Sequence, residues 1–364
     1  MTASIIISTS SNRTLFENFV FHLSEYPTIN DYEIIIVNDG GEYIINDGYF
    51  HQMGIQNAHI IESQNKLGYG VANNLAVEQA TCEHLIFMND DILLKPNCLE
   101  HLISILKNEN IAAVQPKLIY PQSDLIQSTG HFFTKYTNAH AFENMNINYL
   151  PANCSQKRQA LTTALCATDK STFLDAGKFS TDYFNAWEGM EYTLKLSLNG
   201  KTCWYDHEAE AYHIRGGARN QYELNEEAQS ASFWSKWSGL IQEDLPLFIS
   251  KQFKNTTQEY LLLNFSKLPN PEITLSNSGI KISNLASYTY ISGAKSIDFF
   301  RCLPNSFFRS NMDIIYFSNN FFQLKNNLLW FEQRKNKNDL IIDLSRNVLP
   351  TYSLIKSHHK RGSK

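Results

Sequence analysis

The chain has 364 residues, of which 43% are hydrophobic and 13% aromatic, and its formal net charge is −5. A chain of this length and apolar content can bury a sizeable core, which excludes global disorder and predicts one large domain plus a smaller one. The negative net charge argues against a nucleic-acid-binding protein, because such proteins present a basic face to the phosphate backbone.

The cysteines and the N-terminal segment indicate the cellular compartment in which the protein is expected. The six cysteines are widely spaced without a C-x-x-C pair, so neither a zinc site of the usual spacing nor a disulfide framework is expected. The segment 1–8 has no basic stretch and only a short apolar run, which favours a first strand over a signal peptide. No stretch reaches the roughly 18 apolar residues of a membrane-spanning helix. We therefore expect a cytoplasmic protein, with any membrane contact peripheral at the inner face.

Short apolar runs alternate with helical stretches over the first 120 residues. The expected strands are 4–8, 33–37, 58–62, 84–88 and 111–115, and the expected helices are 14–25, 68–80 and 96–107. Strands that alternate with helices imply right-handed βαβ units and a mainly parallel sheet. The predicted class is therefore α/β, and ligands of such sheets bind at the carboxyl ends of the strands.

The pattern changes in the rest of the chain. Residues 127–163 are irregular and rich in Asn, Tyr and His, as expected of an excursion over a site, and regularity returns at 164–176. The elements expected next are a helix at 187–198, two short strands at 202–206 and 210–214, and a Trp-rich helix at 223–242. After about residue 244, recurrent short strand-like runs predict a smaller β-rich module. The expected domains are therefore 1–245 and 246–364.

Polar residues follow three of the expected strands. Asn89, Asp90 and Asp91 are the sharpest case, because adjacent carboxylates that leave a buried strand are costly unless they are solvated or neutralised. A divalent cation would neutralise them, since Mg²⁺ and Mn²⁺ prefer hard oxygen ligands. The alternative is an Asx turn that caps the following helix. The spacing alone leaves both interpretations open.

The ends of the first two strands and the loop before the next helix suit a nucleotide. Asp39 could accept hydrogen bonds from a base or ribose, and the glycines after it permit close backbone approach, although a plain turn is the alternative. Lys66 and Gly68 lie at the start of an expected helix and could lie near phosphate. No G-x-G-x-x-G or Walker pattern is present, so the phosphate signal is weak.

Two later segments carry side chains that suit catalysis. Glu188 and Glu191 share one face at the start of an expected helix, where a carboxylate could take a proton from an acceptor hydroxyl. The alternative is an ordinary i,i+4 pair between Glu191 and Lys195. His213 ends a strand before two glycines and could complete a metal site as a neutral imidazole, although a lone histidine is more often structural.

Taken in order, these segments resemble the family 2 inverting glycosyltransferases of the GT-A fold. The similarity extends over about residues 3–217 and rests on SIIISTSSNR, EIIIVNDGG, ESQNKLGYGVANNLAVEQA, LIFMNDDI, FNAWEGMEYTLKLSLNGK and EAYHIRGG. Any one of these matches is weak, whereas six in the right order and spacing are a strong signal. The stretch Trp187–Tyr192 most resembles galactofuranosyl- and rhamnosyltransferase-like members.

The resemblance implies a reaction and a set of site residues. It implies inverting transfer of a sugar from a UDP- or dTDP-linked donor to a hydroxyl of a saccharide or lipid-linked acceptor, in bacterial surface polysaccharide synthesis. It also implies a divalent cation, Mn²⁺ or Mg²⁺. The implied donor-binding residues are Ser8, Thr9, Asn12, Arg13, Asp39, Lys66, Gly68, Asn73 and Asp90; the implied metal ligands are Asp91 and His213, and the implied base is Glu188 or Glu191.

Two positions depart from the family's pattern. Asn89 is a neutral residue at the first place of the DxD-like element, and Gly189 stands where relatives usually carry the second acid of an acidic pair. Two alternatives to a transferase follow. One is a nucleotide-sugar-binding module without turnover, and the other is a nucleotidyltransferase, for which a Gly-rich basic loop before the first helix is lacking.

The C-terminal tail is basic. From residue 334 onward it contains Arg334, Lys335, Lys337, Arg346, Lys356, Lys360, Arg361 and Lys364 against Asp339 and Asp343. A solvated terminus is the simpler interpretation. The alternative is contact with anionic lipid, at about 1 kcal/mol for each basic residue near the surface.

Overall fold

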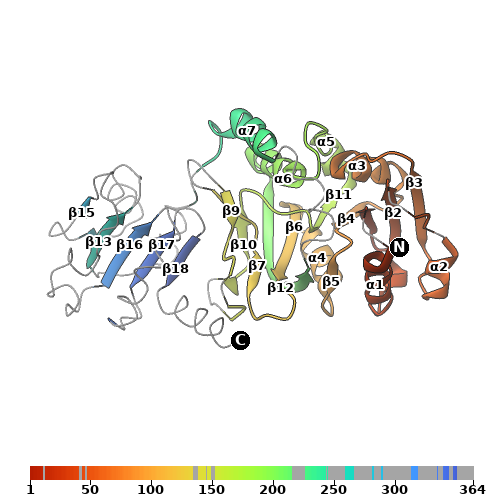
Figure 1. The fold of residues 1–364 in the computed structure, drawn as a ribbon, viewed down its shortest axis with the longest axis horizontal. Helices are drawn as coiled ribbons and strands as arrows, with labels where there is room; N and C mark the ends of the chain where they lie inside the picture. The colour runs from red at the N-terminus through yellow and green to blue at the C-terminus, as the bar shows by residue number, and fades with distance from the viewer. Residues whose placement is uncertain are drawn as a thin grey trace. The chain divides into compact units, whose positions relative to one another are not determined.

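A computed structural model describes the fold of the chain (Figure 1). It describes residues 1–10, 13–40, 43–45, 47–133, 138–144, 146–148, 152–214, 226–242 and 244, the residues 334 and 339, and the C-terminal strands given below. The chain divides into two compact units. The first unit comprises Met1–His131 and Ala152–Leu240, and the second comprises Phe132–Pro151 and Ile241–Lys364.

A mixed, mainly parallel sheet forms the centre of the first unit. Its strands, in spatial order, are β10 (Gln156–Arg158), β12 (Thr202–His213), β6 (Ile111–Ile119), β11 (Leu165–Asp169), β4 (His84–Met88), β1 (Ser4–Thr9), β2 (Glu33–Asp39) and β3 (Ala58–Ser63). The strands β4, β1, β2 and β3 pair in parallel, and so do β6 and β12, whereas β11 is antiparallel to both of its neighbours. The short strands β5 (Ile92–Leu94) and β7 (Ile126–Ser128) pair with β12 and β6. The expected mainly parallel α/β architecture is confirmed.

Helices cover both faces of this sheet. One core cluster joins α1 (Arg13–Ser24) and α4 (Cys98–Leu106) to Ile5 and Ile34 of the strands. The other joins α3 (Tyr69–Gln79), α5 (Lys170–Asp175) and α6 (Glu188–Leu198) to Ile6 and Ile35. Because successive side chains of a strand point to opposite faces, continuous isoleucine runs supply both cores. The remaining described helices are η1 (Ile29–Asp31), α2 (Asp47–Gln52) and α7 (Glu226–Trp237).

Three expectations about the later part of this region are corrected. The strands expected at 202–206 and 210–214 form the single strand β12, in which an irregularity between Asp206 and Glu210 interrupts the pairing with β6. The stretch 127–163, expected to be irregular, contains the short strands β8 (His131–Phe133) and β9 (Asn138–His140) besides β10. The Trp-rich helix expected at 223–242 is α7, which ends at Trp237, and residues 215–225 at its expected start lie outside the described part of the chain.

The second unit contains a sheet of its own. Its strands are β13 (Glu259–Phe265), β14 (Lys281–Ile282), β15 (Tyr288–Thr289), β16 (Asp313–Ser318), β17 (Leu340–Asp343) and β18 (Asn347–Pro350), in the spatial order β14-β13-β16-β17-β18 with β15 beside β13. All of these pairings are parallel except that of β17 with β18. A domain boundary at residue 245 remains a proposal, because the second unit also includes Phe132–Pro151.

None of the helices that the structure describes combines the length and the apolar character needed to cross a membrane. Of the basic tail, residues 335–338, 344–346 and 351–364 lie outside the described part of the chain, so lipid contact stays a prediction.

Candidate active site

The first, second and fourth strands end at the same edge of the sheet. The hydroxyl of Thr9, the last residue of β1, donates a hydrogen bond to Oδ2 of Asp90, which follows β4. The hydroxyl of Ser8 accepts a hydrogen bond of 3.1 Å from Nδ2 of Asn73 in α3. The structure thus brings together four residues expected to bind the donor. Their role in binding stays a prediction.

Asp91 and His213 lie in contact although they are far apart in the sequence. β5 begins directly after Asp91 and pairs antiparallel with the end of β12, so that Ile92 lies opposite His213. As a result, Nε2 of His213 lies 3.0 Å from Oδ1 of Asp91. The backbone N–H of Ile214 donates to the carbonyl of Asp91 at 3.0 Å and closes the ladder.

His213 is held by Gln127 on the other side of its ring. The side-chain Nε2 of Gln127 donates to the backbone carbonyl of His213 at 3.1 Å, so the amide oxygen is the atom that faces Nδ1 of the ring. Because an amide oxygen can only accept, Nδ1 donates to it. This contact leaves Nε2 as the ring nitrogen that faces Asp91.

Asp91 and His213 supply two potential metal ligands at this point of the sheet edge. Oδ1 of Asp91 is buried, and the ring atom that faces it is Nε2 of His213 at 3.0 Å. A carboxylate oxygen with an imidazole nitrogen is a donor set that suits Mn²⁺. Within the described residues no group of three potential ligands is present.

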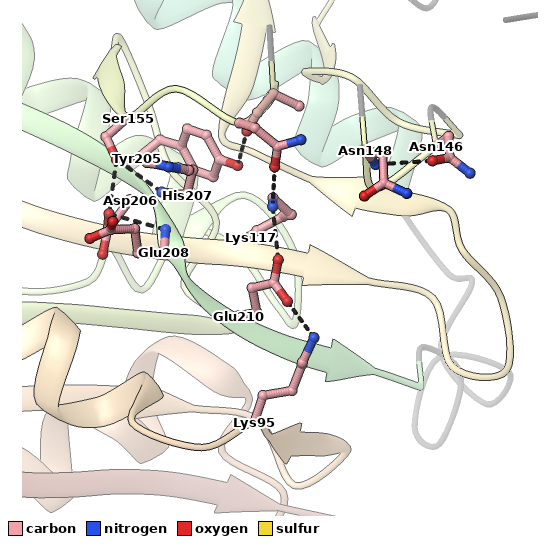
Figure 2. A network of polar contacts seen from close by, with 12 residues as sticks. Lys95, Lys117, Asn146, Asn148, Ser155, Tyr205, Asp206, His207, Glu208 and Glu210 are labelled. Carbon is pink, nitrogen blue, oxygen red and sulfur yellow. Dashed lines mark hydrogen bonds and ion pairs between the residues drawn. The ribbon is translucent and has the colours of Figure 1, made fainter. Parts of the chain in front are cut away.

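A partly buried ion-pair network surrounds Glu210, which precedes His213 in the same strand β12 (Figure 2). Glu210 of β12 accepts from Nζ of Lys117 at 2.8 Å and also binds Nζ of Lys95, which directly follows β5. The side chain of Lys117 is only 3% exposed. Burial alone would raise the pKa of Glu210, but the hydrogen bonds and charges of the two lysines outweigh it and lower that pKa.

The network ties together the three strands whose alignment brings Asp91 into contact with His213. Glu210 joins β12 to β6 through Lys117 and to the end of β5 through Lys95. A slip of β5 by one residue would turn its side chains to the opposite face and separate Asp91 from His213. The bridge is therefore a structural support of the site.

Asp39 binds its own chain. Its carboxylate is 3% exposed and accepts hydrogen bonds from the backbone N–H groups of Leu67 and, at 3.0 Å, Gly68. Gly68 has a φ of +84°, and a Cβ there would lie 2.7 Å from the ring of Phe184. Only glycine meets both conditions at low cost. Asp39 thus fixes the loop before α3, a structural role that the sequence did not indicate, and its contact with a nucleoside stays a prediction.

Three other expected donor-binding residues receive less support. Arg13 is 74% exposed and forms a 2.7 Å ion pair with Glu17 one turn along α1. The backbone of Lys66 packs against Gly40, where an added Cβ would lie 3.0 Å from the Lys66 nitrogen. Asn12 lies outside the described residues.

Glu188 is the first residue of α6 and is almost fully buried. It is 2% exposed, and its Oε1 has no hydrogen-bond partner. Its Cγ packs against the first turn of α3, where a Cβ on Gly70 would lie 3.2 Å away. Burial raises the pKa of Glu188 to about 8, and the groups that oppose this shift are backbone N–H groups, that of Gly70 among them. A carboxyl group in this pKa range can exchange a proton near neutral pH.

Glu191 is equally buried but has partners. Its Oε1 accepts a 2.9 Å hydrogen bond from the indole N–H of Trp237 in α7. The ammonium groups of Lys195 and Lys236 lie 3.9 Å from its carboxylate oxygens. The expected contact with Lys195 is therefore present. The partners from α7 could not be identified from the sequence, because they are far away along the chain.

Packing explains the glycine that follows Glu188. A Cβ at Gly189 would lie 1.9 Å from Oγ1 of Thr163, a distance that no side chain can tolerate. This oxygen also accepts a hydrogen bond of 3.0 Å from the hydroxyl of Tyr69. Thr163 thus fills the space that an acid at position 189 would need.

The first unit is therefore an α/β domain of the GT-A type, with a mainly parallel Rossmann-like sheet and polar side chains gathered at its carboxyl edge. Residues 4–162 match the family model described as glycosyl transferase family 2. This match covers β1 to β10, including Asp39, Asp90 and Asp91. No curated protein matches the chain in sequence.

Several solved structures are similar to this chain. Mannosyltransferase PcManGT from Pyrobaculum calidifontis, in complex with GDP-Man and Mn²⁺, has 14% identity and a TM-score of 0.44 over 70% of this chain and 65% of that one. GalNAc-T7 with UDP, GalNAc and Mn²⁺ has 10% identity and a TM-score of 0.50 over 77% and 55%. TarS 1–349 of S. aureus in complex with UDP-GlcNAc has 16% identity and a TM-score of 0.44 over 62% of each chain. This chain thus spans between 55% and 65% of the length of these structures, and the likeness to GalNAc-T7 concerns the fold alone.

Proposed function

We propose that the first unit is a metal-dependent inverting glycosyltransferase that moves a sugar from a nucleoside-diphosphate donor to an acceptor hydroxyl. The observation that carries this proposal is the buried Oδ1 of Asp91 lying 3.0 Å from Nε2 of His213, at the carboxyl edge of a GT-A sheet. The family match of residues 4–162 supports it independently. The runner-up, a nucleotide-sugar-binding module without turnover, is favoured only by Asn89 and Gly189.

The donor is assigned to the strand ends. Asp91 and His213 would hold the cation, which when bound neutralises the charge that develops on the leaving diphosphate. Asp90 is held by Thr9 beside this pair, and Ser8 and Asn73 join the edge to α3. Asp39 fixes the loop that contains Lys66 and Gly68 through hydrogen bonds to the backbone. By positioning this loop, Asp39 would contribute to the binding of the nucleoside.

The base is assigned to Glu188. In a single displacement, the acceptor hydroxyl gives its proton to the Glu188 carboxylate while its oxygen forms a bond to the anomeric carbon. The bond from that carbon to the diphosphate oxygen breaks, and its electron pair leaves with the diphosphate. Attack from the opposite side inverts the anomeric configuration. The burial that raises the pKa of Glu188 to about 8 favours its uptake of the proton.

The donor is proposed as a UDP- or dTDP-hexose and the acceptor as a saccharide or glycolipid of a bacterial surface polysaccharide. The galactofuranosyl- and rhamnosyltransferase-like character of Trp187–Tyr192 supports this choice of donor. A cytoplasmic enzyme with peripheral contact at the inner membrane face would meet lipid-linked acceptors, and the basic residues of the tail support that part of the proposal.

A labelled-donor panel tests the proposal on the full chain, with Mn²⁺ present or removed by a chelator. We expect a labelled glycoside from one donor, lost on chelation and in Asp91→Ala, with Asn89→Asp retaining metal affinity. Released pyrophosphate would instead indicate a nucleotidyltransferase. Donor binding without product would indicate a binding module, and transfer that is insensitive to chelation would contradict the metal-dependent mechanism.

A further inference from the structure

We propose that Glu191 is a positioning residue: it anchors α7 to α6 and thereby holds Trp187 in the conformation that directs Glu188. This inference rests on the proposed function only in treating Glu188 as the base. The two glutamates at the start of α6 then have different roles: Glu188 accepts the proton, and Glu191 anchors the neighbouring helix α7.

The segment that leads into α6 has an unusual backbone. Asn185 and Trp187 have φ values of +59° and +75°, in the left-handed region. Asparagine adopts this region readily, whereas a bulky residue such as Trp187 is a genuine outlier there, at a cost of about 1–3 kcal/mol, and persists only where the surroundings hold it. Because Glu188 directly follows Trp187, the direction of its side chain depends on this conformation.

Contacts on both sides hold the segment. Oδ1 of Asn185 accepts a 2.7 Å hydrogen bond from the N–H of Tyr69, the first residue of α3. The ring of Trp187 packs against Phe233 of α7 with centroids 4.9 Å apart, and Phe233 is fully buried. Asn185 is thus tied to the loop beside the donor-binding edge, whereas Trp187 depends on α7.

α7 is attached to the same segment at further points. The N–H of Phe184 donates to Oε1 of Gln229 at 2.6 Å, and Lys236 forms a 2.6 Å ion pair with Asp182. These two contacts are exposed and are therefore worth little each. The hydrogen bond from Trp237 differs from these two contacts because its acceptor, the carboxylate of Glu191, is only 2% exposed. Hydrogen bonds to a charged group are strong when that group is shielded from water. Glu191 is therefore the principal polar anchor of α7 on α6.

The test compares Trp237→Phe, which removes the indole N–H, with Glu191→Gln, which keeps an oxygen that can accept it. Trp204→Phe is the matched control, because the indole N–H of Trp204 has no hydrogen-bond partner in the structure. We expect Trp237→Phe to lower kcat about ten-fold, or roughly 1.4 kcal/mol, with donor KM unchanged. Glu191→Gln should have a smaller effect and Trp204→Phe none. Glu191→Ala combined with Trp237→Phe should be no worse than Glu191→Ala alone, since both remove the same contact.

A second readout does not require transfer. The free energy of unfolding is measured against pH for pairs of variants with and without Glu188→Gln, so that their difference reports the titration of Glu188 alone. We expect this titration to move toward the ordinary range of a glutamate in Trp237→Phe, because a released Trp187 would let water reach Glu188, and to stay in place in Trp204→Phe.

The outcomes separate the two proposals. If no donor supports transfer but the Glu188 titration moves in Trp237→Phe, the proposed function fails and the positioning role stands. An unmoved titration would overturn the positioning role whatever the activity. A loss of transfer in Glu191→Gln as complete as in Glu188→Gln, with Trp237→Phe normal, would also overturn it and make Glu191 the base.

Discussion

Glu210 and Glu188 are two carboxylates of the first unit whose surroundings are opposite. Glu210 lies between two lysines, one of them 3% exposed, and its pKa is lowered (Figure 2). Glu188 has an unpartnered oxygen and its pKa is raised to about 8. Glu210, whose side chain is 23% exposed, stays charged beside its cationic partners and holds strands in register, whereas Glu188, which is 2% exposed and has no such partner, can hold a proton. Burial and partners together separate the structural carboxylate from the candidate catalytic one.

The largest expected effect concerns the unpaired carboxylate. Glu188→Gln keeps the shape of the side chain but cannot take a proton, so transfer should fall by about 10²–10⁴-fold with donor affinity retained. Single-turnover transfer and calorimetric donor titration measure the two quantities. Weakened donor binding with an unchanged rate of the chemical step would assign Glu188 to the donor site instead.

The paired carboxylate should matter for stability. Glu210→Ala leaves Lys117 buried without its counter-charge, and we expect a loss of about 3–5 kcal/mol in the free energy of unfolding. Replacing both Glu210 and Lys117 by methionine should be far milder, because no unpaired charge remains. Denaturant unfolding compares the variants. An equal loss in the double variant would mean that packing, and not charge, holds this part of β12.

Gly189, the residue next to Glu188, allows the packing beside the unpaired carboxylate to be tested. Gly189→Ala places a Cβ against Oγ1 of Thr163 and should cost about 1–3 kcal/mol. Adding Thr163→Gly should recover part of that loss, because the two sites share the same space. Thermal unfolding of the two single variants and the double variant gives the coupling. Strict additivity would show that Thr163 does not exclude a side chain at position 189.

The most gradual effect is a pH dependence of stability, which is spread over several pH units. The folded-state pKa of Glu188 lies at about 8, above the ordinary 4.5, so the folded chain keeps a proton that the unfolded chain loses. Its contribution to stability is complete below pH 4.5 and is lost as the pH rises toward 8, at no more than about 1.36 kcal/mol per pH unit. Glu210, whose pKa is lowered, contributes in the opposite sense and loses its share on acidification. Relative to Glu188→Gln, the wild type should lose stability over that window, and a constant difference would contradict the raised pKa.

Periodic features of the fold could be predicted from the sequence. The apolar run at 84–88 coincides with β4, and the helix ended by Asn199-Gly200 is α6, because local patterns determine such elements. The single strand β12 was not predictable in this way. Its polar residues near 207–208 read as a break between two strands, whereas they accompany an irregularity within one.

The candidate site could be predicted in part. The family resemblance proposed Asp91 and His213 as metal ligands and Glu188 or Glu191 as the base, and these roles stay predictions. The contact of Asp91 with His213 depends on the register of β5 against β12, which no local pattern encodes. The same limit applies to Glu191, whose partner Trp237 lies in a different helix. Asp39 was predicted as a ligand-binding residue, and its bonds to the loop before α3 became visible only in the structure.

The most direct test of the central claim is the pH dependence of single-turnover transfer at saturating donor, for the wild type and Glu188→Gln. If Glu188 is the base, the wild-type rate rises with pH and levels off near the pKa of about 8, since only the deprotonated carboxylate accepts the proton. Glu188→Gln should be slow and without that rise. A wild-type rate that is flat from pH 6 to 9, or a variant that keeps the wild-type profile, would contradict the assignment.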